Sequence, residues 1–253
     1  MSLDASLAGR VAVVTGASRG IGRSIARAFA ARGAHVVMLA RRGERLEREA
    51  KEIEPLALPI VCDVSDPKRV NAAFAEIGER FGSVDVLVNN AGLARIRALE
   101  ECSDDDVLAQ VGANFLGAVW CTRAALPWLR KSSGADIVNI GSESFQEPFP
   151  LLSLYAAAKG GLAVFSNAML RELRPTGIRV THCIAGRTKT EFGIDWTPEE
   201  SARGYQVWGE QGYLTRVSGE GYVDADEFAQ TVLYVVTRPR AMMLDVVQVR
   251  AQK

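Results

Sequence analysis

Short apolar runs, rich in valine and isoleucine, recur at regular intervals along the chain. A continuous apolar run of five or six residues, without polar alternation, is typical of a strand that is buried on both faces. We expect seven such strands, at residues 10–15, 35–40, 58–62, 84–88, 137–140, 178–184 and 243–249.

Longer amphipathic segments separate these runs. Their apolar positions recur every three or four residues, which is the period of a helix with one buried face. We expect helices at residues 21–32, 44–53, 67–81, 104–130, 153–173 and 224–237. Strict alternation of strand and helix predicts the α/β class: one doubly wound parallel sheet of about seven strands with helices on both faces, a Rossmann-type fold.

The sequence has no Pro/Ser-rich linker, internal repeat or low-complexity tract, so we expect a single domain over residues 1–253. Residues 186–222 are the exception to the periodic pattern. A long irregular segment in a compact domain is more often a lid than a connector, and ligands of such sheets bind where this segment would emerge. We expect a substrate lid, and five of its residues outside any clean period are aromatic: Phe192, Trp196, Tyr205, Trp208 and Tyr213.

Charge and cysteine usage narrow the class of partner. Lys and Arg number 30, as do Asp and Glu, so the chain shows no electrostatic footprint for nucleic acid or an anionic membrane surface. The four cysteines lack CxxC spacing and the two histidines lack metal-ligand partners, so neither a metal site nor a disulfide framework is expected. The start does not resemble a secretory signal, and no apolar stretch approaches the roughly 18 residues of a membrane span. We expect a cytoplasmic protein without membrane or nucleic-acid partners.

A glycine-rich turn, Thr15-Gly-Ala-Ser-Arg-Gly-Ile-Gly22, follows the first strand directly and leads into a helix. Glycines at these positions allow a tight turn and a close approach of the backbone to a pyrophosphate at the helix N-terminus. The spacing is GxxxGxG, not the general GxGxxG fingerprint, and a glycine-rich turn can also be a plain strand-to-helix connection. Its place after the first strand favours phosphate binding.

The end of the second strand indicates which dinucleotide would bind. An acidic residue there would hydrogen-bond a ribose 2′-hydroxyl and repel a 2′-phosphate, but the chain reads Leu39-Ala-Arg-Arg42. Arg41 together with Arg19 could hold a phosphate by charge-assisted hydrogen bonds, which favours NADP over NAD. The alternative is a solvated arginine pair at the start of a charged helix.

Tyr155 and Lys159 stand four residues apart, and Ser142 lies thirteen residues before the tyrosine. On a helix, positions i and i+4 share one face, so the ammonium would lie beside the phenol. A positive neighbour lowers the pKa of a tyrosine from about 10 toward the working pH, which would make Tyr155 a general acid and base. The alternative is a packing tyrosine beside a solvated lysine.

Together these residues resemble the short-chain dehydrogenase/reductase family, in its compact NADP-preferring branch. The resemblance runs from about Leu7 to the last strand and rests on an ordered set of motifs: Thr15-Gly16-x-x-x-Gly20-x-Gly22, Asp63, Asn89-Asn90-Ala91-Gly92, Asn114, Ser142 and Tyr155-x-x-x-Lys159. It implies hydride transfer between a nicotinamide and a carbonyl or alcohol carbon, with Asn114, Ser142, Tyr155 and Lys159 as catalytic residues.

The family's roles carry over to individual positions. Asn114 would support a water relay behind Lys159, Ser142 would hold the substrate oxygen, although Ser144 is a similar strand-end serine, and Lys159 would also bind the nicotinamide ribose. The residues implied in cofactor binding, besides Tyr155 and Lys159, are Gly16, Ser18, Arg19, Gly20, Ile21, Gly22, Arg41, Asp63, Val64, Asn90, Ala91, Gly92, Gly186 and Thr188.

The chain departs from the family pattern at two places. Ala185 replaces the usual proline before Gly186, which suggests a looser turn beside the nicotinamide, and the usual Val-Asp-Gly-Gly finish is missing. Family habit implies a homodimer or homotetramer through the helices at residues 104–130 and 153–173. Three functions stay open: an NADPH-dependent carbonyl reductase of ketones, aldehydes or keto esters with an apolar pocket, an NAD-linked alcohol dehydrogenase, and a non-catalytic NADP(H)-binding regulatory protein.

Overall fold

The computed structural model describes residues 6–213 and 221–252. Its centre is a seven-stranded sheet in which every neighbouring pair of strands is parallel. Every strand expected from the sequence is present, and the fold class is confirmed. In spatial order the strands are β3 (Ala57–Val61), β2 (His35–Ala40), β1 (Val11–Thr15), β4 (Val86–Asn89), β5 (Asp136–Ser142), β6 (Arg179–Ala185) and β9 (Val246–Val249).

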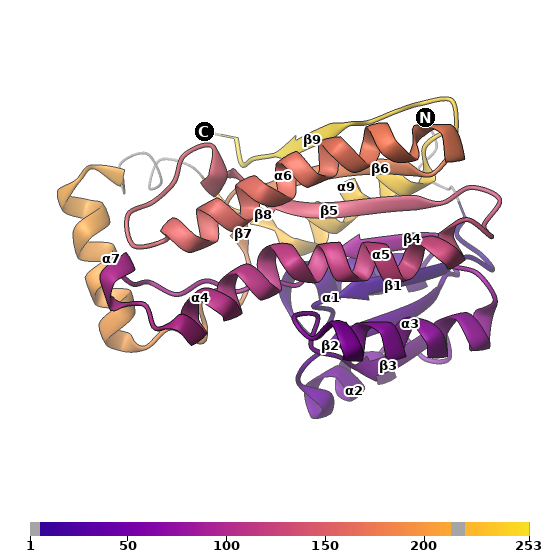
Figure 1. Ribbon diagram of the computed structural model, residues 1–253, viewed down its shortest axis with the longest axis horizontal. Helices are drawn as coiled ribbons and strands as arrows, with labels where there is room; N and C mark the ends of the chain where they lie inside the picture. Colours follow the sequence, from indigo (N-terminus) through magenta and orange to yellow (C-terminus); the bar gives the residue numbers. More distant parts are fainter. Residues whose placement is uncertain (1–5, 214–220, 253) are drawn as a thin grey trace.

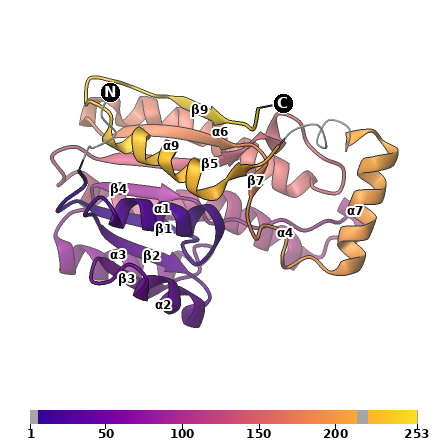
Figure 2. The same ribbon diagram turned by 180° about the vertical axis from the view of Figure 1, so that it is seen from behind.

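Helices cover both faces of the sheet, as Figures 1 and 2 show from opposite sides. Two apolar cores result, and alternate residues of one strand enter different cores: Val36 and Met38 of β2 face one, Val37 and Leu39 the other. This explains why the strands read as continuous apolar runs. One face carries α1 (Gly20–Ala30), α2 (Gly43–Lys51) and α9 (Ala225–Thr237), and the other carries α3 (Pro67–Phe81), α5 (Gly117–Leu129) and α6 (Ser153–Leu173).

The helix expected over residues 104–130 is interrupted. It consists of α4 (Asp104–Val111), a π-helical turn at Gly112–Leu116, and α5. Gly117 packs so closely on the segment after β3 that a Cβ there would lie 2.7 Å from Cγ2 of Val64. Such π-turns occur frequently at functional sites, and this one contains Asn114.

The segment expected to be a lid contains a helix that its sequence period did not reveal, α7 (Pro198–Glu210). Thr197 Oγ1 accepts from the Glu200 amide at 3.1 Å, and Glu200 Oε2 accepts from the Thr197 amide at 2.9 Å. This capping box, followed by proline at the first helical position, was a readable start signal. Short parallel strands β7 (Thr188–Lys189) and β8 (Val223–Asp224) join the two ends of the segment, and its residues 214–220 lie outside the described residues.

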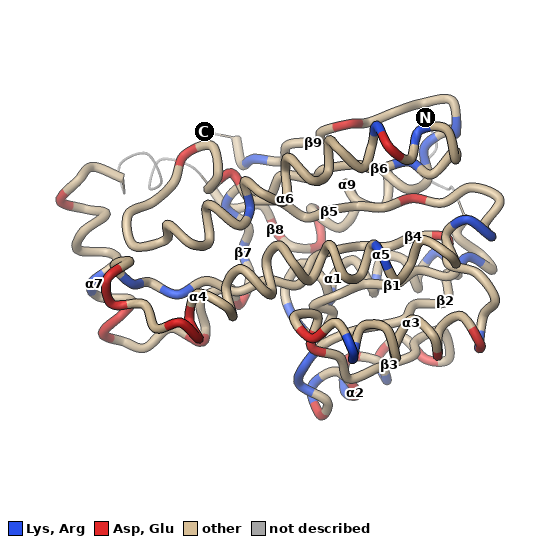
Figure 3. Tube along the Cα trace, in the orientation of Figure 1, with Lys and Arg blue, Asp and Glu red and all other residues tan. Residues whose placement is uncertain are grey.

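Surface charge is mixed: acidic and basic positions are interspersed along the trace (Figure 3). Within residues 6–213 and 221–252, no helix has the length and apolar character that a membrane span requires.

A buried ion cluster lies at the start of β5, at the amino ends of the strands, opposite their carboxyl ends. Both carboxylate oxygens of Asp136 accept from Arg179, at 2.8 and 3.1 Å. Arg240 approaches the same carboxylate at 3.2 Å, Arg10 at 3.5 Å and Arg238 at 3.8 Å. Asp136 thus neutralises guanidinium groups from three parts of the chain.

Replacing Asp136 by asparagine should lower the free energy of unfolding by about 3–5 kcal/mol, because buried arginines lose their counter-charge. Chemical denaturation measures this. Asp66→Ala is the control, because Asp66 caps α3 by accepting from the Lys68 and Arg69 amides and its loss should cost only about 1 kcal/mol. A loss for Asp136→Asn no larger than that of the control would contradict the role given to the cluster.

Candidate active site

A cavity of about 590 Å³ opens at the carboxyl ends of the strands, which is where ligands bind in open α/β sheets. Its volume is in the range of small-molecule and cofactor sites. It is lined by all but one of the residues that the sequence suggested for the site. The exception is Gly22, which serves packing: a Cβ there would lie 2.4 Å from both Asn90 Nδ2 and Gly16 O.

The glycine-rich turn is tied to the segment after β4. Thr15 Oγ1 accepts from the amides of Asn90 and Ala91 at 2.9 and 3.0 Å, and Asn90 Nδ2 donates to Thr15 O at 2.9 Å. Gly16 has a φ of +66°, and a Cβ there would lie 2.9 Å from Cα of Ala91. Only glycine fits both the conformation and the contact, so this wall of the cavity has a fixed shape.

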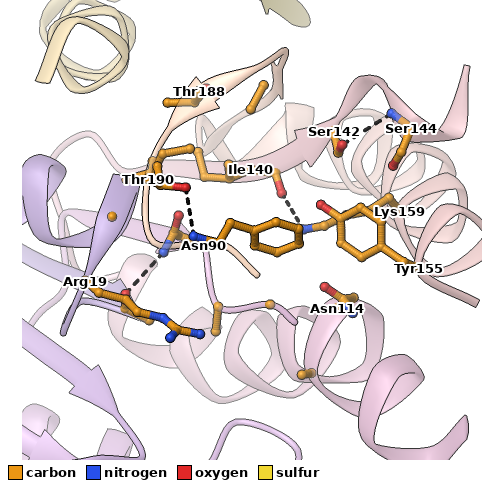
Figure 4. Close-up of a pocket in the computed structure, with 18 of the residues that line it drawn as sticks. Arg19, Asn90, Asn114, Ile140, Ser142, Ser144, Tyr155, Lys159, Thr188 and Thr190 are labelled. Atoms are coloured by element: carbon orange, nitrogen blue, oxygen red, sulfur yellow. Dashed lines mark hydrogen bonds between the residues drawn. The ribbon is translucent and has the colours of Figure 1, made fainter. Parts of the chain in front are cut away.

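Tyr155 and Lys159 lie on α6 and are both buried, 8% and 4% exposed. Figure 4 shows their side chains together in the cavity, with the ammonium directed at Ile140 of β5. Lys159 Nζ donates to Ile140 O at 2.9 Å and lies 5.9 Å from the centre of the Tyr155 ring. Burial lowers the pKa of Lys159 to about 8, so the ammonium form still predominates at neutral pH.

The electrostatics of Tyr155 differ from the sequence prediction. Burial raises the pKa of its phenol above the usual 10, and a side-chain hydrogen bond with Ser142 opposes the rise. The Lys159 ammonium donates its hydrogen bond to the Ile140 carbonyl, and burial is the largest influence on the pKa of the phenol. The phenol is therefore protonated at neutral pH and can act as a proton donor.

The structure distinguishes the two serines that follow β5. Ser142 is the serine whose side chain opposes the rise in the pKa of Tyr155, and its Oγ accepts from the Ser144 amide at 3.2 Å, which fixes its position (Figure 4). Ser144 is buried, and its Oγ has no hydrogen-bond partner among the described residues. The interaction with the phenol therefore favours Ser142, rather than Ser144, as the serine that acts with Tyr155.

Asn114 joins the π-helical turn to the chain after β4. Its Nδ2 donates to Leu93 O at 2.6 Å and to Gln110 O at 2.8 Å, and its Oδ1 accepts from the Leu93 amide at 3.2 Å. The same Oδ1 would lie 2.6 Å from a Cβ at Gly92. The asparagine thus holds the cavity wall next to Lys159.

The turn after β6 is held more firmly than the Ala185 substitution suggested. Ala185 is paired with Ser142 of β5 and Val249 of β9, and the Gly186 amide donates to Val249 O at 2.9 Å. A Cβ at Gly186 would lie 2.9 Å from that same oxygen. Thr188 Oγ1 donates to Gly186 O at 3.1 Å, so strand pairing fixes this part of the cavity.

The end of the cavity beside Asp63 is rich in arginine. Arg41 is exposed and lies 3.9 Å from the Asp63 carboxylate, which itself accepts from Ser65. Arg19 Nη1 is buried and has no hydrogen-bond partner in the part of the chain that the structure describes, so it is a donor suited to an anionic ligand. Arg42 also lines the cavity, although the sequence argument did not include it in the site.

A dinucleotide phosphate fits this donor set. Arg19 Nη1 is a donor without a partner among the described residues, and carboxylates of the 186–222 segment lie on Arg19 and on the Gly20 amide, so these groups bind anions. No metal is suggested: among the described residues, no group of three or more His, Cys, Asp or Glu side chains could hold an ion. All four cysteines are free thiols.

His182 of β6 lies against Gly141 of β5, the strand that ends at Ser142. Its Nε2 is buried without a hydrogen-bond partner in the described chain and fills the space that a side chain at Gly141 would need, since a Cβ there would lie 2.0 Å from it. Burial lowers the pKa of His182 to about 4, and the Lys159 charge adds to the effect. The imidazole is therefore neutral and acts in packing.

Known proteins resemble this chain over most of its length. The model of a family described as short chain dehydrogenase matches residues 10–201. The NADP-dependent 3-hydroxy acid dehydrogenase of Schizosaccharomyces pombe is 32% identical over 238 residues, which cover 92% of this chain and 88% of that protein.

Solved structures also resemble this chain over nearly its whole length. A short chain dehydrogenase from Burkholderia cenocepacia J2315 in complex with NADP is 32% identical, with a TM-score of 0.82 and coverage of 96% and 97% of the two chains. The 3-ketoacyl-(acyl-carrier-protein) reductase from Brucella melitensis, complexed with NADH, is 28% identical, with a TM-score of 0.83 and coverage of 96% and 98%.

His182 should make the protein less stable in acid. Its pKa is about 6.5 in the unfolded chain and about 4 when folded, so between these pH values the unfolded state binds more protons and stability falls as pH falls. The difference corresponds to about 3 kcal/mol, gained in full above pH 6.5. Denaturation of His182→Gln between pH 7 and 4 should show a shallower loss than wild type.

His35→Gln is the matched control, because His35 is exposed. A stability profile of His182→Gln that parallels both wild type and the control would mean that His182 does not resist protonation.

Proposed function

The chain belongs to the short-chain dehydrogenase/reductase family, and we propose that it is an NADPH-dependent reductase of a ketone, aldehyde or keto ester. The observation that carries this proposal is the buried group at the cavity floor. The Tyr155 phenol lies in the cavity with Ser142, whose side chain opposes the rise of its pKa, and beside the Lys159 ammonium. These side chains form a proton donor and an oxygen-binding group that require neither histidine nor metal.

Several features support NADP as the cofactor. Arg19, Arg41 and Arg42 line one end of the cavity, and the end of β2 contributes no carboxylate that would repel a 2′-phosphate. Relatives are described as NADP-dependent or were solved with NADP. An NAD-linked alcohol dehydrogenase is the second candidate, favoured by the relative that was solved with NADH.

Side chains of this protein account for the proton in the reaction. A bound nicotinamide would supply the hydride to the carbonyl carbon. Ser142 then holds the carbonyl oxygen in line with Tyr155, and Tyr155 donates its proton as negative charge develops on that oxygen. The protonated phenol is the proton donor for reduction, and alcohol oxidation would be the same step in reverse.

Lys159 and Asn114 support this step. The Lys159 ammonium would bind the nicotinamide ribose and stabilise the phenolate that forms when Tyr155 gives up its proton. Asn114 fixes the backbone around Leu93, and in this proposal it supports a water relay that returns the proton.

The substrate is proposed to be apolar or aromatic. Phe149 packs on Trp208 with ring centres 5.4 Å apart, and Phe192 lies 5.5 Å from Tyr155. These rings line the cavity and offer little hydrogen bonding to a polar substrate. We treat residues 1–253 as one catalytic domain in which 186–222 is the substrate lid.

Self-association through the α4–α5 and α6 helices also belongs to this proposal, as a homodimer or homotetramer. Leu108 of α4 and Val164 of α6 are 67% and 73% exposed, and their burial on association would be favourable. We place the protein in the cytoplasm, without nucleic-acid or membrane partners. A purely regulatory NADP(H)-binding role is disfavoured because the complete set of catalytic residues would then serve no purpose.

Tyr155→Phe should lower turnover by a factor of about 10² to 10⁴, because proton donation is lost. The measurement is initial NADPH oxidation, and separately NADH oxidation, against ketones and aldehydes, with aryl ketones expected to exceed sugars and charged acids. NADPH affinity should change little. Tyr205→Phe, another tyrosine that lines the cavity, is the matched control, and equal activity of both variants would refute Tyr155 as the acid.

Arg41→Asp should weaken NADPH binding at least tenfold, because a charge-assisted contact worth about 1.5–3 kcal/mol is replaced by repulsion. NADH binding should change little. Fluorescence titration with both cofactors tests this. Arg48→Asp makes the same charge change at an exposed position on α2 and serves as control, and unchanged NADPH affinity in Arg41→Asp would remove the argument for NADP.

A further inference from the structure

Two acidic side chains of the 186–222 segment lie on the cationic groups of the cofactor end. Glu191 Oε2 accepts from the Gly20 amide at 3.0 Å, at the N-terminus of α1. The other carboxylate oxygen of Glu191 accepts from Arg45 and lies 3.8 Å from Arg23. The contact spans more than 170 residues of sequence.

Asp195 bridges two arginines of the same cavity. Its Oδ2 accepts from Arg19 at 2.9 Å, and its Oδ1 accepts from Arg42 at 2.7 Å. Its backbone is held as well, because Arg95 Nη1 donates to Asp195 O at 3.3 Å. The Arg42 and Arg19 pairs hold Asp195 ionised, with a pKa below its usual value.

These are the groups that the phosphates of a dinucleotide need. The N-terminus of α1 is the expected place for a pyrophosphate, and Arg19 and Arg42 flank Arg41 where a 2′-phosphate would bind. A carboxylate and a phosphate cannot use the same N–H groups at once. The two carboxylates therefore compete with the cofactor.

We propose that Glu191 and Asp195 form an acidic latch that determines cofactor specificity: the pyrophosphate displaces Glu191, and the 2′-phosphate of NADP displaces Asp195. The proposal rests on the proposed function, since it takes a nicotinamide dinucleotide as the ligand. Glu191 then lowers the affinity for NADP and NAD alike. Asp195 lowers the affinity for NADP alone, because NAD has no 2′-phosphate and leaves Asp195 on its arginines.

The latch also connects the cofactor to the substrate pocket. Phe192 and Trp196 stand next to the two carboxylates in sequence, and their rings lie 6.0 Å apart. Phe192 lies 5.5 Å from the Tyr155 ring, and Trp196 Nε1 donates to Ala94 O at 2.8 Å. Displacement of Asp195 by NADP should therefore move the aromatic wall beside the proton donor, and NAD should not move it to the same extent.

The test is calorimetric binding of NADP⁺ and NAD⁺, without substrate, to the wild type and to Asp195→Asn and Glu191→Gln. Asp195→Asn should bind NADP⁺ about three- to tenfold more tightly with NAD⁺ affinity unchanged, and Glu191→Gln should tighten both by a similar factor, as expected for half-exposed ion pairs. Glu199→Gln removes an equal charge from an exposed position of α7 and should change neither affinity. Thermal unfolding of each variant verifies its folding.

A second measurement does not depend on the charge variants. Adding NADP⁺ to the wild type should change the emission assigned to Trp196, obtained as the difference from Trp196→Phe, and NAD⁺ should change it less.

The outcomes separate the latch from the proposed function. If both nucleotides bind but Asp195→Asn leaves NADP⁺ affinity unchanged or weaker, or if saturating NADP⁺ does not alter Trp196 emission, the latch is wrong and the function stands. If neither the wild type nor any variant binds a dinucleotide, the function fails and the latch fails with it.

Discussion

The site depends on one buried charge. The Lys159 ammonium is almost completely removed from water, and it is tolerated there because Ile140 O accepts a hydrogen bond from it at 2.9 Å. A buried charge without such a partner would be very costly, so α6 and β5 must pack at a fixed distance. A chain of buried amides and hydroxyls fixes that distance: Asn139 of β5 donates to Ser166 of α6 at 2.9 Å and accepts from Asn89 of β4 at 2.8 Å.

The same burial decides the state of Tyr155. A phenol in a low-dielectric site holds its proton more tightly, and the neighbouring ammonium is already hydrogen-bonded to a carbonyl. The i, i+4 spacing therefore supplies the right pair of groups, but the electrostatic balance of the pair depends on the rest of the cavity. This is why the direction of the tyrosine pKa could not be read from the spacing alone.

What the sequence predicts well is local. The strands follow from apolar runs that both cores require, and the Tyr155–Lys159 pair follows from helix geometry. What it did not predict depends on distant partners: the fit of His182 against Gly141 joins two strands, and the contact of Asp195 with Arg19 joins residues 176 positions apart. The helix α7 is a different case, because its capping box at Thr197 is readable in the sequence, although the irregular aromatic spacing hides the helical period.

The arginines of the cofactor end explain why acidic residues lie there. Several guanidinium groups at one half-buried rim repel one another, and this repulsion must be reduced when no phosphate is present. Carboxylates on the adjoining segment reduce it, as Asp195 does between Arg19 and Arg42. Cations that bind a phosphate strongly also bind a nearby carboxylate. Affinity for the cofactor and competition from the carboxylates of residues 186–222 therefore arise from the same charges. A site of this kind gains selectivity only if the competing carboxylate lies where the two cofactors differ, which is the position that Asp195 occupies in the proposed arrangement.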